Sequence, residues 1–159
     1  RVHILNPGTG VGGHCIAVDP WFIVSEFPKE SSLIKKSRET NNYKTNWVLE
    51  KIKNEALVFK VNKSKDPVIA CMGLAFKPDI DDLRESPALF VAESLEKQGF
   101  NVLAVEPNLS ENKDRKLTNY NHAVNQADII VYLVAHNEFN NLEIDSKKIV
   151  LDFCGVLKK

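Results

Sequence analysis

The spacing of apolar residues changes near residue 66, and the two spacings predict two kinds of structure. From about residue 31 to 62 the chain contains neither Gly nor Pro, and apolar side chains recur every three or four residues, as in Tyr43/Trp47 and Val48/Ile52/Ala56/Phe59. This stripe predicts one helix, with Ser31 or Ser32 as its N-cap. At about 45 Å the helix would be longer than a compact domain needs, which is typical of an element that bridges two units or carries an oligomer contact.

From Asp66 onward, short apolar runs alternate with helical stretches. We expect strands over residues 68–72, 101–105, 128–134 and 148–152, and helices over 87–98 and 122–126. Continuous apolar strands separated by helices favour a parallel sheet covered on both faces. The predicted fold is therefore α/β, a long connecting helix followed by a doubly wound, mainly parallel, Rossmann-like sheet. We divide the chain at residues 1–62 and 63–159.

Composition excludes some functions. The 159 residues carry 21 Lys and Arg against 21 Asp and Glu, interleaved along the chain, so no basic face favours nucleic acid. No apolar run approaches the roughly 20 residues of a membrane span, and no leader pattern is visible; we expect a cytoplasmic protein without a membrane partner. Three widely spaced cysteines argue against a disulfide framework or a metal site.

A glycine-rich stretch lies near the start of the chain. Gly8, Gly10 and Gly13 fit the G-x-G-x-x-G dinucleotide fingerprint, which requires a strand before the glycines and a helix after them. Here Pro7 precedes the stretch, and Asp19-Pro20 interrupts any helix soon after it. We therefore favour a flexible loop over a dinucleotide site.

The same stretch offers a thiol and a carboxylate four residues apart. If the chain is helical from Gly13, Cys15 and Asp19 lie on one face. A thiol near a helix start is favoured as thiolate, and a neighbouring carboxylate could direct water at an acyl carbon on sulfur. The alternative is a buried structural cysteine.

Two long motifs carry a resemblance to a known family. GVGGHCIAVDP (residues 10–20) and GLAFKPDIDDLRESPA (residues 73–88) resemble the UDP-glucose/GDP-mannose dehydrogenase family. The resemblance implies that the chain holds the catalytic cysteine loop, the central helix and the UDP-binding domain, and that an NAD-binding domain would precede it. The family's catalytic lysine and asparagine have no match here, so we expect no turnover by this chain alone.

The family oxidises a sugar CH₂OH to a carboxylate by two hydride transfers to NAD⁺. By resemblance, Cys15 forms a thiohemiacetal and then a thioester, and Asp19 helps water to hydrolyse it. The expected substrate is UDP-N-acetylmannosamine, with UDP-glucose or UDP-N-acetylglucosamine as alternatives. Two other classes stay open: a UDP-sugar-binding module without activity of its own, and a thiol-dependent acyl transferase with His14 as base.

The resemblance also implies the binding residues. Gly10, Gly12, Gly13 and His14 would cradle the substrate, Phe76 and Lys77 would contact UDP, Arg84 would reach the NAD pyrophosphate, and Arg1 would enter the partner subunit's site. Without the family motif, Phe76 would be interpreted as an aromatic residue at the edge of the core and Lys77 as a solvated lysine. Arg84 would be interpreted as half of a surface ion pair with Asp81 or Glu85. The long helix would build a homodimer.

Two residues near strand ends have no assigned role. His136 could line a nucleotide crevice, but could equally be a capping or surface histidine. Cys154 stands where some relatives carry a basic residue, which argues against a charged contact at that position.

Overall fold

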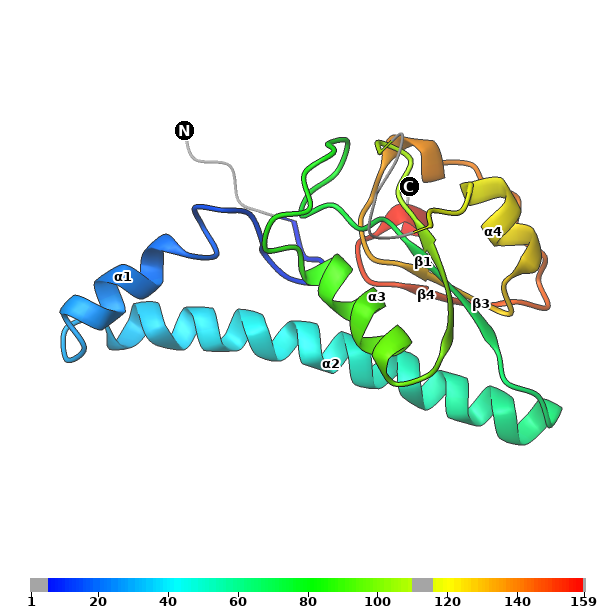
Figure 1. Ribbon diagram of the computed structural model, residues 1–159, viewed down its shortest axis with the longest axis horizontal. Helices are drawn as coiled ribbons and strands as arrows, with labels where there is room; N and C mark the ends of the chain where they lie inside the picture. The colour runs from blue at the N-terminus through cyan, green and yellow to red at the C-terminus, as the bar shows by residue number, and fades with distance from the viewer. Residues whose placement is uncertain (1–5, 110–115, 159) are drawn as a thin grey trace.

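The computed structural model describes residues 6–109 and 116–158. In these ranges a helical arm precedes a four-stranded sheet (Figure 1). The helices are α1 (Asp19–Glu26), α2 (Ser32–Lys63), α3 (Pro87–Lys97) and α4 (Tyr120–Gln126), with single 3-10 turns η1 (Asn137–Phe139) and η2 (Val156–Lys158). The strands are β1 (Val68–Met72), β2 (Asn101–Val105), β3 (Ile129–Tyr132) and β4 (Ile149–Asp152).

The sheet is entirely parallel, in the order β2-β1-β3-β4. The chain leaves β1 toward β2 on one side and later returns to place β3 on the other side, so the topological switch point lies between β1 and β3. In open sheets of this kind the crevice at the carboxyl ends of the strands, at the switch point, is where ligands bind. The predicted doubly wound α/β class is confirmed.

Helices cover both faces of the sheet. On one face, α2 and α3 pack Val48, Ile52, Val91 and Leu95 against β1 and β3; on the other, α4 and η1 contribute to a second buried cluster. The central strands β1 and β3 are therefore buried on both faces, which explains their unbroken apolar sequences. The predicted strands and helices appear with bounds shifted by at most two residues at either end.

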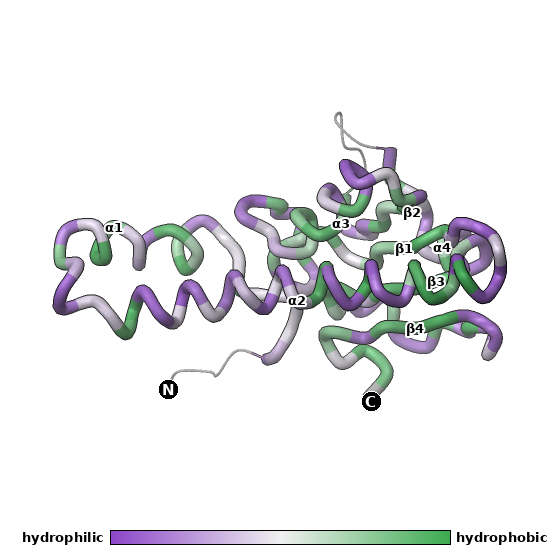
Figure 2. The backbone as a smooth tube through the Cα atoms, turned by 90° about the horizontal axis from the view of Figure 1, so that it is seen from below, coloured by the Kyte–Doolittle hydropathy of each residue, from purple (hydrophilic) through white to green (hydrophobic). Residues whose placement is uncertain are grey.

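The long helix α2 extends beyond the sheet unit. Its 32 residues span about 48 Å, and only its second half lies against the sheet. The first half runs beside α1, forming the helical arm, which we define as residues 19–47 (Figures 1 and 2). Ser31 occupies the N-cap position, but its hydroxyl donates to the Phe27 carbonyl oxygen instead of accepting from the helix. None of the described helices is long and apolar enough to cross a lipid bilayer.

Candidate functional site

The glycine-rich loop lacks the setting of a dinucleotide site. No strand is formed over residues 6–18, and residues 14–18 form a turn that leads into α1. Proline occupies the first turn of α1, where its missing N–H costs nothing. Asp19-Pro20 thus starts a helix instead of interrupting one. The chain is not helical from Gly13, the condition under which Cys15 and Asp19 were expected to share a face. One bond of the helical i to i+4 type joins them, because the Asp19 N–H donates to the Cys15 carbonyl oxygen at 2.8 Å.

Helix α2 holds this loop in place. The Asn41 side chain accepts a hydrogen bond from the Val11 N–H at 2.8 Å and donates to the Val11 carbonyl at 3.2 Å. One turn later, the Thr45 hydroxyl donates to the Thr9 carbonyl at 3.2 Å. The Thr9 hydroxyl in turn donates to the Leu133 carbonyl at the end of β3. The loop is therefore fixed between the long helix and the sheet, a role for Asn41 and Thr45 that sequence patterns did not reveal.

Close packing explains two of the glycines. A Cβ atom at Gly12 would clash with the Glu85 carbonyl oxygen and stand 3.0 Å from the Cβ of Phe76. At Gly13 it would stand 3.0 to 3.3 Å from the Phe76 ring, and the positive φ of 89° strains any L side chain. The loop therefore presses its backbone against Phe76, so these glycines serve protein packing whether or not a substrate is bound.

A cavity of about 460 Å³ opens at the switch point between β1 and β3, within the size range of small-molecule sites. The glycine-rich loop forms one wall. The other walls are formed by the segments that come directly after β1, β3 and β4 and by the first residues of α3. The lining includes Gly10, Val11, Gly12, Ile16, Ala75, Phe76, Lys77, Pro78, Pro87, Ala88, Leu133, Val134, Ala135 and Cys154.

The residues expected to bind substrate or act in catalysis fall into three groups. Gly10, Gly12, Phe76 and Lys77 line it. Gly13, His14 and Cys15 continue the loop between lining residues 12 and 16; Cys15 is an exposed, free thiol, and Asp19 and His14 are also exposed. Arg1 lies outside the described residues.

Arg84 forms an exposed bidentate ion pair, but with a different partner from those expected. Its Nη2 lies 2.6 Å from Asp82 Oδ2, and its Nε lies 3.0 Å from both carboxylate oxygens. Asp82, not Asp81 or Glu85, is the partner, and these bonds lower the pKa of Asp82 to about 2. The Arg84 carbonyl also accepts from the Gly13 N–H. The cation is thereby placed beside the cysteine loop.

Burial separates the three thiols. Cys71 is fully buried within β1. Cys154 comes after β4 and lines the cavity. Burial is the main cause that raises the pKa of its thiol to about 12, and the nearby Asp152 carboxylate adds to it. Cys154 is therefore a neutral thiol and provides no charged contact to the cavity.

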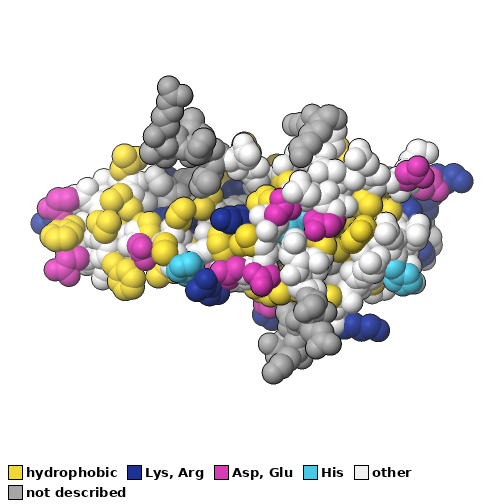
Figure 3. Space-filling model, turned by 90° about the horizontal axis from the view of Figure 1, so that it is seen from above, with side chains coloured by type: hydrophobic (Ala, Val, Ile, Leu, Met, Phe, Trp, Pro, Cys, Tyr) yellow, Lys and Arg dark blue, Asp and Glu magenta, His cyan; other side chains and the backbone are white. Residues whose placement is uncertain are grey.

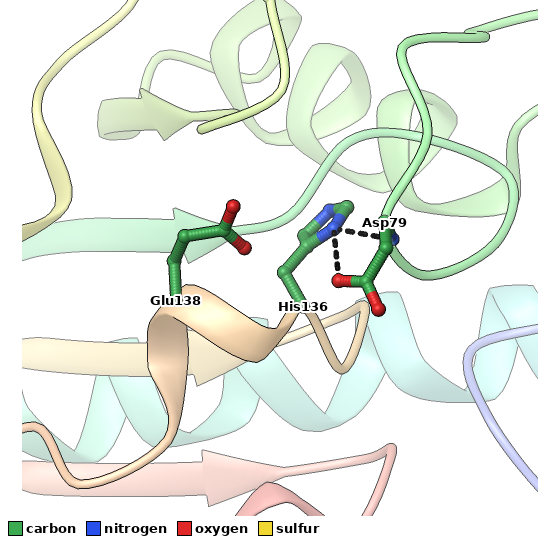
Figure 4. A group of neighbouring side chains, drawn as sticks. All are labelled: Asp79, His136 and Glu138. Atoms are coloured by element: carbon green, nitrogen blue, oxygen red, sulfur yellow. Dashed lines mark hydrogen bonds and ion pairs between the residues drawn. The ribbon is translucent and has the colours of Figure 1, made fainter.

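His136 proves to be fully buried, neither capping a helix through its side chain nor lying at the surface. It lies near Asp79 and Glu138 at the end of β3 (Figure 4). Three such groups could suggest a metal site, but His136 Nδ1 already accepts the Asp79 N–H at 3.0 Å. Its lone pair is engaged, so these side chains as placed do not form a metal-binding set.

Glu106, directly after β2, is a further residue that sequence reasoning missed. Its carboxylate is buried and lies 3.0 Å from His136 Nε2. Burial opposes ionisation, but hydrogen bonds from His136, Leu74 N–H and Ala75 N–H outweigh it, so the pKa of Glu106 lies below its usual value. A usable signal was available: an acidic residue and a histidine each follow an apolar strand, and parallel strands bring such positions to one edge of the sheet.

Comparisons with known proteins agree with this geometry. Residues 70–159 match the UDP-binding domain of the UDP-glucose/GDP-mannose dehydrogenase family, and residues 1–43 match the family's central domain. The UDP-N-acetyl-D-mannosamine dehydrogenase of Campylobacter jejuni is 48% identical over 97% of this chain and 38% of its own length. The NDP-N-acetyl-D-galactosaminuronic acid dehydrogenase of Ralstonia nicotianae is 45% identical over 98% of this chain and 37% of its own.

Solved structures show the same likeness. The UDP-N-acetyl-mannosamine dehydrogenase of Staphylococcus aureus superposes with a TM-score of 0.73 at 33% identity, covering 100% of this chain and 37% of that one. The corresponding enzyme of Pyrococcus horikoshii gives 0.76 at 29% identity, covering 100% and 38%. The chain spans less than two fifths of the length of these relatives. By sequence and by fold, the chain belongs to the UDP-glucose/GDP-mannose dehydrogenase family.

Proposed function

We propose that this chain supplies the catalytic cysteine loop and the UDP-binding unit of an NAD-dependent UDP-sugar 6-dehydrogenase. The cavity at the β1/β3 switch point carries the proposal, because it lies between the glycine-rich loop and the segment that bears Phe76 and Lys77. Residues 1–62 would present the thiol, and residues 63–159 would bind the nucleotide. The similarity to UDP-N-acetylmannosamine dehydrogenases favours UDP-N-acetylmannosamine as the sugar nucleotide; UDP-glucose and UDP-N-acetylglucosamine are the alternatives.

Lys77 and the start of α3 suit a diphosphate. Lys77 is an exposed lysine that lines the cavity, and an ammonium group is a common phosphate ligand. Pro87 and Ala88, the first residues of α3, line the same cavity, so the positive end of the helix dipole adds to the attraction for an anion. Phe76 offers an apolar surface for the base or the sugar.

The Cys15 thiol suits the second oxidation. NAD⁺, when bound, takes up one hydride in each oxidation. The exposed Arg84 would bind the diphosphate of NAD⁺ after its ion pair with Asp82 opens. The thiol adds to the C6 aldehyde, its proton passes to the carbonyl oxygen, and a thiohemiacetal forms on sulfur. Loss of hydride from that carbon, together with loss of the hydroxyl proton to solvent, leaves a thioester. Water oriented by Asp19 then breaks the C–S bond, releasing the carboxylate and restoring the thiol.

Calorimetric titration of UDP into this chain tests the binding half of the proposal. We expect UDP to bind, and Lys77→Ala to weaken its affinity about tenfold through the lost charged contact. Lys97→Ala is the matched control, since Lys97 lies at the far end of α3 and pairs with Glu93. Absence of UDP binding to the unchanged chain would contradict the proposal.

The chemical half requires a longer polypeptide that carries this chain together with an NAD-binding unit. There, Cys15→Ala should abolish NADH release from UDP-N-acetylmannosamine while UDP affinity is retained. Undiminished turnover would reject Cys15 as nucleophile. If UDP binds well but no UDP-sugar is oxidised by the longer polypeptide, a binding module without activity becomes the better description.

The helical arm suits a second copy of the chain. Phe22, Leu33 and Tyr43 are exposed by 69%, 78% and 68%, and Figure 3 shows hydrophobic side chains gathered over this end of the molecule. Apolar surface on this scale marks an interaction site, so we propose a homodimer formed through α2 and its neighbour α1. Light scattering should give twice the chain mass, and Leu33→Asp should shift it toward the monomer; a monomeric wild-type chain would refute the dimer.

A further inference from the structure

Two buried side chains hold the two ends of the segment that carries Phe76 and Lys77. The segment runs from Leu74 to Asp79, directly after β1. Glu106 follows β2 and holds the start of the segment, while His136 follows β3 and holds its end. Both side chains are buried, at 3% and 0% exposure. Neither has a role in the chemistry described above.

Glu106 satisfies backbone groups that have no strand partner. Its Oε2 accepts from the Leu74 N–H at 2.8 Å, from the Ala75 N–H at 2.9 Å and from His136 Nε2 at 3.0 Å. Its Oε1 accepts from the Asn108 N–H at 3.1 Å. An ionised carboxylate accepts all four bonds, and loss of its charge or oxygen atoms would leave buried donors unpaired.

His136 transmits the same restraint to Asp79. Its Nδ1 faces two donors, the Asp79 N–H and the Asn108 side-chain amide, both at 3.0 Å. Nδ1 must therefore be unprotonated, and Nε2 carries the proton that is donated to Glu106. Figure 4 shows the ring directed at Asp79. Phe139 packs edge-on against the ring, with centroids 5.4 Å apart, which fixes its orientation.

We propose that Glu106 and His136 are positioning residues for nucleotide binding, acting by holding the Leu74–Asp79 segment in its binding conformation. The inference rests on the proposed function, since it requires Phe76 and Lys77 to contact UDP. Without the two anchors the segment would sample other conformations, and UDP would have to order it on binding. Preorganisation of this kind raises affinity without any direct contact to the ligand.

Calorimetry with UDP and hydrogen exchange on the unliganded chain test the proposal together. His136→Phe keeps an aromatic ring but removes all three hydrogen bonds of His136; we expect UDP affinity to fall about tenfold or more and the Asp79 amide to exchange faster. His136→Asn restores an acceptor near the Nδ1 position and should recover part of the affinity. Glu106→Gln keeps the side-chain shape and is the second variant, should His136→Phe fail to fold.

Val124→Ala provides the control for lost stability. Val124 belongs to the buried cluster under α4 and forms no part of the segment or the cavity, so this variant should lower thermal stability with UDP affinity unchanged. Weakened UDP binding by the His136 and Glu106 variants, with partial rescue by Asn, supports the proposal. Unchanged affinity despite lowered stability would overturn it. A wild-type chain that binds no UDP would overturn the proposed function itself, which separates the two failures.

Discussion

The helical arm and the sheet unit of this chain use apolar residues in opposite ways. In the sheet unit, strands and helices bury their apolar side chains in two clusters. In the arm, α1 has no buried residue, and Phe22, Phe27 and Leu33 are exposed. Apolar side chains thus form a buried core in one region and an exposed surface in the other. The cysteine loop lies between them and is fixed by polar contacts to both.

Thiol reactivity should show the contrast most strongly. At pH 8 iodoacetamide should alkylate the exposed Cys15, while Cys71 stays protected by burial. Cys154, with its pKa raised to about 12, is ionised in only about one molecule in ten thousand at that pH, so its alkylation should be slower by orders of magnitude. Peptide mass spectrometry over time measures the three rates. Equal labelling of Cys15 and Cys154 would contradict the difference in environment.

Truncation of apolar side chains on the two halves of α2 tests the contrast in stability. Ile52 is fully buried against the sheet, whereas Leu33 is 78% exposed on the arm. Ile52→Ala should lower the free energy of unfolding by about 2–5 kcal/mol, and Leu33→Ala should change it by less than about 0.5 kcal/mol. Urea titration of dilute chain, where the chain is monomeric, compares the two. A large effect of Leu33→Ala would mean that the arm has a buried partner within the same chain.

Acid unfolding tests the charge at the edge of the sheet. Because the pKa of Glu106 is lowered in the folded chain, folding favours its ionised form. The stabilisation is complete above the unfolded pKa of about 4.3 and is lost as pH falls through the lower folded value. Glu106→Gln should therefore lower the free energy of unfolding by about 1–3 kcal/mol at neutral pH. Below a pH of about 4.3, the free energy of unfolding of this variant should fall less steeply with pH than that of the unchanged chain. An unchanged acid limb would show that Glu106 is not the group responsible.

Removal of one clamp on the glycine-rich loop should give the smallest effect. Asn41→Ala deletes both bonds to Val11 and should lower the free energy of unfolding by about 1 kcal/mol, with faster exchange of the Val11 amide. Asn42→Ala, at the exposed next position, is the control. Equal effects of the two variants would show that the loop does not depend on this clamp.

The sequence by itself determined the elements and the candidate chemistry. Periodicity predicted α2, because one face of that helix repeats apolar side chains every three or four residues, and continuous apolar runs predicted the four strands. The motifs around Cys15 and Lys77 pointed to the family because their residues are contiguous. The α1 helix was missed because Asp19-Pro20 was interpreted as a break, although Pro in the first turn of a helix is favourable.

Only the tertiary structure decided which distant residues act together. Arg84 pairs with Asp82 and not with Asp81 or Glu85. The sequence pattern does not indicate which of three nearby carboxylates will be the partner. His136, Glu106 and Asp79 lie 27 to 57 residues apart and meet because parallel strands β1, β2 and β3 end at one edge of the sheet. Side chains such as Glu106 and His136 bond to loop N–H groups that have no strand partner. Which N–H groups lack a partner is decided only when the strands pair, so the local sequence does not reveal it.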